Sequence, residues 1–445
     1  MRIDENTNPI KLAWPIFIEV LLFMIMGNVD TVMLSRFSDL AVAAVGNANQ
    51  ILNTLLILFN ITSAATGIMV TQFIGASHKK DLNQVYTLAF GSNILLSGLI
   101  ATLLYTFQLK FLGLINMPSE LYPDTIAYLN TMLGFLFVPA LFTVSSVILK
   151  SHGQTKLSMY LAMGMNIINV IGNYIFLFGP FGLPILGVKG VAISTVFSRS
   201  IAVVIMLVVL VKYYGVKPSI KHLLLVPKKL VIQFLKLGLP SAGEPISWQF
   251  SQMVIFSFIN LMGTAVVTTK IYVQIIVWFT YLATLAIAQA NQIIVGHLIG
   301  AGKEEEAYRI TMRSVKQSLA ITMTVSLVFV IFRHSLMSIF TKDPLIIKLG
   351  AQIIMIDFLV EFGRVLNLVI INAFKAAGDV NFPVVAGVFS MWLVSTAGAY
   401  YFGVVLEFGL IGIWLAMAAD EILRGLLMLR RLIKGGWRGK RVIHE

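Results

Sequence analysis

The sequence predicts an all-α polytopic membrane protein. We expect twelve transmembrane helices in two six-helix bundles, related by pseudo-twofold symmetry along the membrane normal. Of 445 residues, 58% are hydrophobic and only 12% are charged, and the mean hydropathy is +0.88. In a soluble domain about a quarter of the residues are charged. Apolar runs of about 20 residues, each long enough to cross roughly 30 Å of hydrocarbon, recur along the chain. The alternating segments typical of a transmembrane β-barrel are not found.

The apolar runs predict twelve spans. In order they cover residues 12–34, 47–74, 86–108, 126–149, 158–179, 188–211, 238–262, 271–299, 312–332, 346–374, 383–405 and 410–431. When the loops are sorted alternately to two sides, one set carries most of the lysines and arginines. Such loops stay on the cytoplasmic side, so we expect both termini in the cytoplasm of a multi-pass protein of the cell (inner) membrane. The same loops account for the net charge of +13, so we expect no nucleic-acid partner.

The two halves of the chain resemble each other at a constant offset of 225 residues. The segment "PIFIE" (Pro15–Glu19) corresponds to "PSAGE" (Pro240–Glu244), and "FIGAS" with "LIGAG" and "LKSHGQ" with "FKAAGD" keep the same offset. Six spans separate corresponding points, so the halves have the same orientation. The repeat predicts an N-terminal six-helix lobe over 1–211, a basic cytoplasmic linker over 212–236, a C-terminal six-helix lobe over 237–431 and a basic cytoplasmic tail over 432–445.

One carboxylate, Asp30, lies near the end of the apolar run of the first span. A charged group at bilayer depth costs roughly 3 kcal/mol unless it is paired or faces a cavity. Asp30 therefore predicts an ion or proton site, unless the span ends near Gly27 and leaves the acid at the outer interface. Glu19 lies eleven residues earlier, close to three helical turns, so both acids fall on nearly one helix face. Glu19 is either a secondary site or an interface residue near Lys11.

The fifth span carries a stripe of amides. Asn166, Asn169 and Asn173 stand at spacings of three and four residues, so they share one helix face. Amides in hydrocarbon need hydrogen-bond partners. The stripe either bonds to neighbouring helices as a packing contact, or it hydrogen-bonds Asp30 and helps to set the proton affinity of that acid.

The tenth span contains a charged triad. Asp357, Glu361 and Arg364 stand at i, i+4 and i+7, on one helix face. Two acids and one base are nearly neutral together, so the triad is either an ion-pair clamp or a charge site in the C-terminal half. The remaining intramembrane charges are interpreted as clamps or interface anchors: Arg199 in span six, and Asp420, Glu421 and Arg424 in span twelve.

Motifs of enzymes and metal sites are missing from the sequence. The chain has no cysteine, which excludes disulfides, thiolate-bound metals and thiol catalysis. It has no Walker A sequence, no HExxH and no GxSxG. We therefore expect no enzyme activity, no cofactor and no resident metal.

Three segments together resemble the multidrug and toxic compound extrusion (MATE) family, in the manner of its bacterial DinF-like and NorM-like members. They are "GNVDTVMLSRFSDLAVAAVG", "QFIGASHKKD" and "LKSHGQTKLSMYLAMGMNIINVIGNYIFLFG". The resemblance covers the whole chain and implies a cation-coupled antiporter, with the acid of the "VDT" motif at Asp30. The family's asparagine of span five falls on Asn169, and the aspartate that often follows it falls on Asn173. The second acid is thus an amide in this chain, and Thr195 is implied to complete the network.

The resemblance extends less closely to the C-terminal half. Some relatives carry a glutamate in span seven and an aspartate in span ten. These positions correspond to Trp248 or Gln249 and to Arg364, and the nearest acids are Glu244 and Glu361. A C-terminal charge site is therefore expected among Glu244, Asp357, Glu361 and Arg364.

The function implied is secondary active multidrug efflux. The protein is expected to export bulky, often cationic, drug-like small molecules in exchange for H⁺ or Na⁺, by alternating access between two lobes. The alternative is a lipid-linked oligosaccharide flippase of the same superfamily, although twelve spans and the acid of "VDT" argue against it. Membrane lipids are the other expected partners, and a monomer is the expected state.

Overall fold

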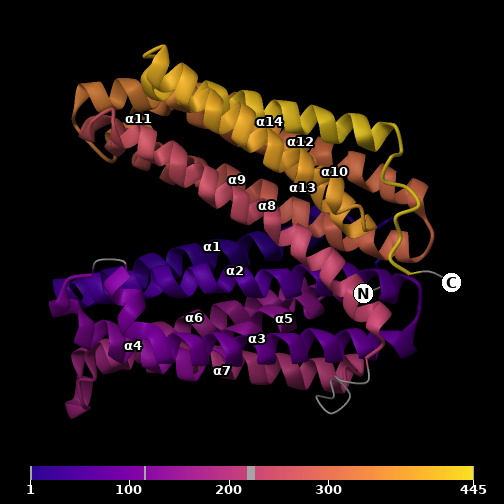
Figure 1. Ribbon diagram of the computed structural model, residues 1–445, viewed down its shortest axis with the longest axis horizontal. Coiled ribbons are helices and arrows are strands. Elements are labelled where there is room, and N and C mark those ends of the chain that lie inside the picture. The colour runs from indigo at the N-terminus through magenta and orange to yellow at the C-terminus, as the bar shows by residue number, and fades with distance from the viewer. Residues whose placement is uncertain (1–2, 115–116, 218–225, 444–445) are drawn as a thin grey trace. The chain divides into compact units, whose positions relative to one another are not determined.

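The computed structural model describes residues 3–114, 117–217 and 226–443, and this part of the chain folds into helices without a β-strand (Figure 1). The α-helices are α1 (Pro9–Ser35), α2 (Asp39–Gly75), α3 (Lys79–Leu114), α4 (Tyr122–Gly134), α5 (Phe137–Ser151), α6 (Thr155–Phe178), α7 (Gly187–Tyr214), α8 (Lys228–Asn260), α9 (Thr264–Gly300), α10 (Glu304–Ile331), α11 (Arg333–Ser338), α12 (Pro344–Ala377), α13 (Asn381–Ser390) and α14 (Gly409–Ile433). Short 3₁₀ turns η1 (Ser119–Leu121) and η2 (Pro180–Gly182) precede α4 and α7, and the π-helical segments η4 (Met391–Thr396) and η5 (Ala399–Val405) continue α13. The predicted all-α class is confirmed.

Each predicted span coincides with a helical segment in the described part of the chain. Eight helical stretches there are long and apolar enough to cross a membrane, and a bent pair makes a ninth. The other three, α8, α12 and α14, contain 33, 34 and 25 residues, so each is also long enough to span. These three carry the intramembrane charges of the C-terminal half, which explains why composition alone does not mark them as spans.

The fourth predicted span, 126–149, is continuous in the prediction but broken in the structure. The helical stretch Ser119–Gly134, which contains α4, ends at Gly134. The helix α5 that follows is bent from it by 51°. Pro139 explains the break, because proline lacks the N–H that would bond to the carbonyl four residues earlier and its ring clashes with that carbonyl. That carbonyl belongs to Phe135, one of the two residues between the helices.

Local sequence signals fix several helix ends. The Asp343 side chain accepts a hydrogen bond of 2.9 Å from the backbone N–H of Leu345 at the start of α12, which is an N-cap. Gly179, Gly215 and Gly378 follow α6, α7 and α12 with φ of 56°, 64° and 93°. Glycine adopts this left-handed conformation without the strain that a Cβ would add, so it ends the helices there.

The chain divides into two compact units. The first comprises residues 18–70 and 78–238, and the second comprises residues 2–17, 71–77 and 239–445, apart from the segments outside the described residues. The first unit has an apolar core that includes Phe59, Leu112, Tyr128, Leu133 and Leu177. The core of the second includes Val273, Met337, Ile353, Ala399 and Trp414. In the second unit, α12 packs against α9, α10 and α14 (Figure 1).

The lobe boundaries expected from the repeat stay a prediction. Within them, residues 1–2 and 115–116 of the N-terminal lobe, 218–225 of the linker and 444–445 of the tail lie outside the described residues.

The predicted tail packs against the second unit. Trp437 is only 2% exposed, and Val442 donates its backbone N–H to Gln72 Oε1 at 2.9 Å. Gly439 N and Arg438 Nη2 donate to Glu304 and Glu305 at 2.9 and 2.7 Å. The backbone also passes close to Gly378, where a Cβ would lie 2.3 Å from the Lys440 carbonyl oxygen. The described part of the tail is therefore an ordered strap.

Candidate functional site

Asp30 is placed on α1 by the long apolar helix that the sequence predicted, and it is half-buried. Asn173 on α6 donates its Nδ2 to Asp30 Oδ1 at 2.7 Å. Asn173 is fully buried, and its own Oδ1 has no hydrogen-bond partner among the described residues. The amide stripe of span five therefore does reach the carboxylate of span one, and a charged carboxylate gains most from such a donor.

Asn169 and Thr195 extend this contact. With the amide oriented so that both of its polar atoms are paired, Asn169 Nδ2 donates to Asp30 Oδ1 at 3.2 Å, and its oxygen accepts from Thr195 Oγ1 and N at 3.2 Å. Ser194 Oγ donates to the backbone carbonyl oxygen of Asn169 at 2.8 Å. The four residues predicted from the resemblance thus lie together, within the first unit.

A basic residue that the sequence analysis interpreted as a clamp or interface anchor lies one helical turn from this cluster. Arg199 follows Thr195 by four residues on α7, so both stand on the same face of that helix. No ion pair joins Arg199 to Asp30 in the part of the chain that the structure describes. Tyr128 on α4 is buried and donates its hydroxyl to Asn49 Oδ1 at 3.2 Å.

Glu19 has separate contacts. Its Oε1 lies 2.8 Å from Lys150 Nζ at the end of α5 and accepts from Ser146 Oγ at 3.3 Å. Neither contact involves Asp30. The other half repeats the pair, because Glu244 Oε2 lies 2.8 Å from Lys375 Nζ at the end of α12. Both residues of the second pair follow those of the first by 225 positions.

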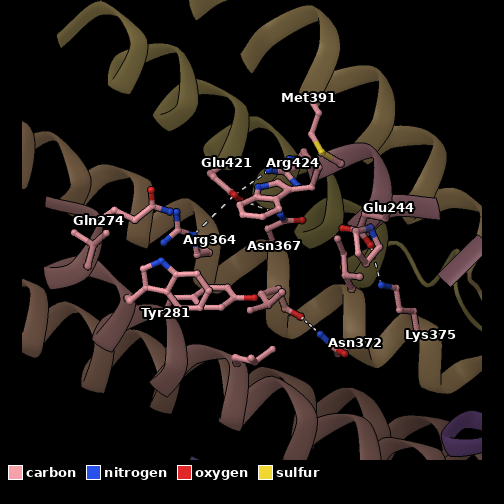
Figure 2. Close-up of a pocket in the computed structure, with 17 residues that line it drawn as sticks. Glu244, Gln274, Tyr281, Arg364, Asn367, Asn372, Lys375, Met391, Glu421 and Arg424 are labelled. Atoms are coloured by element: carbon pink, nitrogen blue, oxygen red, sulfur yellow. Dashed lines mark hydrogen bonds and ion pairs between the residues drawn. The ribbon is translucent and has the colours of Figure 1, made fainter. Parts of the chain in front are cut away.

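The second unit contains a cavity of about 330 Å³ (Figure 2). Aromatic side chains of α8 and α9 form one part of its lining, namely Trp248, Trp278 and Tyr281, and Trp278 meets Tyr281 edge to face with ring centroids 5.3 Å apart. Charged and amide groups form another part, namely Glu244, Gln274, Arg364, Asn367, Asn372, Lys375, Glu421 and Arg424, and smaller apolar residues fill the gaps between them. Helices α8, α12 and α14 supply all of the charges of this lining, and Met391 of η4 also belongs to it. A small aromatic molecule with a polar end fits such a lining.

A chain of ion pairs joins α12 to α14 at this cavity. Arg364 pairs with Glu361, which is fully buried, and Arg364 Nε lies 3.9 Å from Glu421 Oε1. Glu421 Oε1 is also 2.9 Å from Arg424 Nη2, and Figure 2 shows Glu421 between the two arginines. Arg424 in turn lies 2.8 Å from Asp420. Each charge of this chain of ion pairs therefore has an opposite charge nearby, which offsets the cost of its burial.

Asp357 lies apart from this chain. The Trp414 indole N–H donates to its Oδ1 at 3.1 Å, and no ion pair joins it to Arg364 among the described residues. Of the triad predicted in span ten, the structure thus brings Glu361 and Arg364 into direct contact, while Asp357 turns to α14. The acid Glu244 is brought to the same cavity from α8.

Several residues of the cavity were not predicted as site residues. Glu421 and Arg424 were interpreted as clamps, and Asn367, Lys375 and Tyr281 were not considered. Asn367 donates to Glu421 Oε2 at 2.9 Å, and its own Oδ1 has no partner in the described part of the chain. Asn367 stands three residues after Arg364, so helical spacing could have added it to the triad. Lys375 could have been found from the repeat, since it corresponds to Lys150.

Comparison with known proteins gives one family. The family model MatE matches residues 15–175 and again residues 240–401. The uncharacterized transporter YisQ of Bacillus subtilis (strain 168) is 40% identical over 437 residues, which cover 98% of this chain and 95% of the relative. The probable multidrug resistance protein NorM of Thermotoga maritima is 26% identical over 442 residues, which cover 98% of this chain and 93% of the relative.

Solved structures share the fold. The Vibrio cholerae MATE transporter VcmN in its bent form superposes with a TM-score of 0.87 at 19% identity, covering 97% of each chain. A MOP superfamily transporter from Pyrococcus furiosus superposes with a TM-score of 0.84 at 17% identity, covering 97% of this chain and 96% of the other. These likenesses establish the polytopic helical fold.

Proposed function

The chain belongs to the MatE family, whose members are membrane transporters and not enzymes, and on this premise we propose that it is a secondary active multidrug efflux antiporter. It would export bulky, often cationic compounds in exchange for H⁺ or Na⁺ and need no cofactor. The relatives named as probable multidrug resistance proteins support the substrate class. The observation that carries the proposal is a half-buried carboxylate, Asp30, held by a buried amide in an otherwise apolar span.

The coupling site that we propose consists of Asp30, Asn169, Asn173 and Thr195. Uptake of a cation changes the charge of Asp30, and a charge change in an apolar surrounding alters the balance between two packings of the helices around it. In the alternating-access cycle that we propose, the lobes 1–211 and 237–431 are the moving parts. Both termini are cytoplasmic and the protein acts as a monomer in the cell membrane.

A second charge site in the C-terminal half is part of the proposal. Five carboxylates and three basic groups of α8, α12 and α14 gather at or beside the cavity: Glu244, Asp357, Glu361, Asp420, Glu421, Arg364, Lys375 and Arg424. The two carboxylates in excess favour binding of a cation there. The buried ion pairs support an equally simple role as a clamp between α12 and α14. Glu19, paired with Lys150, is retained as a secondary candidate.

Substitution of Asp30 tests the proposal. Asp30→Asn keeps the shape of the side chain and resembles the neutral acid, but it cannot gain or lose a proton. We expect it to abolish ethidium efflux from proteoliposomes under an imposed H⁺ or Na⁺ gradient, while the thermal stability of the purified protein stays close to that of the wild type. Asp39→Asn is the matched control, because Asp39 is an exposed acid nine residues further on, and it should leave efflux unchanged. Wild-type efflux by a folded Asp30→Asn protein would exclude Asp30 as the coupling site.

A further inference from the structure

The basic tail is a feature that the proposed function does not use. Lysine and arginine are mostly exposed in proteins, yet Trp437 and Val442 of the tail are buried. Arg438 Nη2 lies 2.7 Å from Glu305 Oε2 and attaches the tail to the start of α10. At Gly378, directly after α12, a Cβ would lie 2.3 Å from the backbone of the tail. The described part of the tail therefore has a fixed place on the second unit.

Helix α2 is divided between the two units. Residues 39–70 belong to the first unit, whereas its last turn and the two residues after it, 71–77, belong to the second. Gln72 lies in this last turn and is fully buried. Its Oε1 accepts from Val442 N at 2.9 Å, and its Nε2 donates to the carbonyl oxygen of Ala376 at 2.6 Å. One side chain thus connects the end of α2 both to the tail and to the end of α12.

The end of α2 also approaches α9 at backbone distance. A Cβ at Gly75 would lie 2.1 Å from the carbonyl oxygen of His297, and a Cβ at Gly300 would lie 2.0 Å from the carbonyl oxygen of Gln72. Small residues allow two helices to come this close. His297 and Gly300 follow Gln72 and Gly75 by 225 positions, so the contact joins equivalent parts of the repeat. This contact and the two bonds of Gln72 together hold the end of α2 on the second unit.

We propose that the tail is a latch, which holds the end of α2 on the second unit and thereby slows the transport cycle. The inference rests on the alternating access proposed above. A cycle between two arrangements of the units has to change the course of α2, because this helix runs from one unit into the other. The tail bonds to Gln72 in the state that the structure shows. A contact made in one of two states shifts the equilibrium toward that state, so the tail acts as a tethered ligand of it.

The strength of the contacts sets the size of the effect. A neutral hydrogen bond such as that between Val442 and Gln72 shifts an equilibrium by about fivefold. The ion pair between Arg438 and Glu305 is exposed, and an exposed pair contributes less. The latch can therefore open in every cycle and still change its rate, and the buried contact at Gln72 is responsible for most of the change.

The distance between two spin labels tests the latch without any transport. The chain has no cysteine, so Ser77→Cys after α2 and Arg313→Cys on α10, both exposed, can be labelled alone. In detergent, we expect one narrow distance for the full chain and a second, broader population after deletion of residues 437–445. Val442→Pro removes the N–H donor and keeps an apolar side chain, so it should populate the same second state less strongly. Lys440→Gln changes an exposed side chain and should match the full chain.

The rate is measured as ethidium efflux from proteoliposomes under an imposed gradient. Deletion of residues 437–445 should raise the turnover by about two- to fivefold, the shift expected for one hydrogen bond. Arg438→Cys together with Glu305→Cys allows the tail to be bridged to α10 by a reducible bis-methanethiosulfonate. Efflux should fall when the bridge forms and recover when it is reduced. Each single cysteine variant, treated with the same reagent, is the control and should not respond.

Two results would overturn the inference. One is a distance distribution of the full chain in both the shortened protein and Val442→Pro, and the other is equal efflux before and after reduction of the bridge. If the shortened chain does not fold, Val442→Pro and the bridged protein decide. If the full-length protein moves no ethidium under either gradient, the proposed function fails instead, and the distance measurement alone then decides whether the tail holds α2.

Discussion

Three amides on one helix face have different surroundings at the scale of single residues. Asn173 and Asn169 reach Asp30, whereas Asn166 Nδ2 has no hydrogen-bond partner among the described residues. The spacing of three and four residues predicted that the amides share a face, and it suggested the contact with Asp30, which is present. The spacing could not tell which amides make the contact, because that depends on the height at which α1 crosses α6.

This difference gives a matched pair of substitutions. Asn173→Ala removes an N–H donor that stabilises the ionised form of Asp30, and a hydrogen bond to a charged group is worth about one pH unit or more. We expect the pH of half-maximal efflux to rise accordingly. Asn166→Ala removes an amide of the same stripe that does not contact Asp30 and should leave the profile in place. Equal shifts in both variants would show that the stripe acts by packing and not by the 2.7 Å contact.

Helix α12 shows what can be read from one element and what cannot. The i, i+4, i+7 pattern placed Asp357, Glu361 and Arg364 on one face, and Glu361 does contact Arg364. The bond from Trp414 to Asp357 and the approach of Glu421 to Arg364 come from α14, which lies beside α12. Helical periodicity describes one helix at a time, so partners on a neighbouring helix could not be predicted.

A double-mutant cycle on α12 follows from these contacts. Arg364→Ala leaves Glu361 buried without its closest countercharge, and breaking a buried pair costs about 3–5 kcal/mol in soluble proteins. Adding Glu361→Gln should recover part of that loss, because fewer charges are then unpaired. Asp357→Asn is the control on the same face and should combine with Arg364→Ala more nearly additively, since Asp357 is bonded to Trp414. Thermal unfolding in detergent measures all of these variants. Equal coupling for both acids would contradict the pairing that the structure gives.

Across the described part of the whole molecule, the structure agrees best with the prediction from the sequence where the apolar runs are long. All twelve predicted spans are helical, because a run of about 20 apolar residues has few alternatives in a membrane. The tail shows the opposite case. Its basic composition predicted only a cytoplasmic location, yet Trp437, Val442 and Ile443 are buried. A short segment with three apolar residues does not reveal which surface it covers, since that surface is assembled from α2, α10 and α12.

Removal of the tail tests this assembly. The amide of Gln72 connects two segments, because Oε1 accepts from Val442 N at 2.9 Å and Nε2 donates to the Ala376 carbonyl oxygen at 2.6 Å. Deleting residues 437–445 should lower the unfolding temperature in detergent. Gln72→Ala should cost about 1–3 kcal/mol in the full chain and less in the shortened one, where the bond to Val442 is already gone.

The control for the tail is Lys440→Gln. This side chain is exposed, and only its backbone approaches Gly378, so the variant should unfold like the wild type. A shortened chain with the stability of the full one would mean that the strap adds no net stability. An equal effect of Gln72→Ala in both backgrounds would mean that the contact with Val442 contributes nothing measurable.

The two equivalent ion pairs, Glu19 with Lys150 and Glu244 with Lys375, bear on the history of the chain. Each pair closes inside its own half at the same distance of 2.8 Å. The most economical history places this pair in an ancestral six-helix protein, before its gene was duplicated and fused. The position equivalent to Asp30 in the second half holds the buried Ile255. The ion pair is thus a feature that both halves share, whereas the acid proposed for coupling stands in the first half alone.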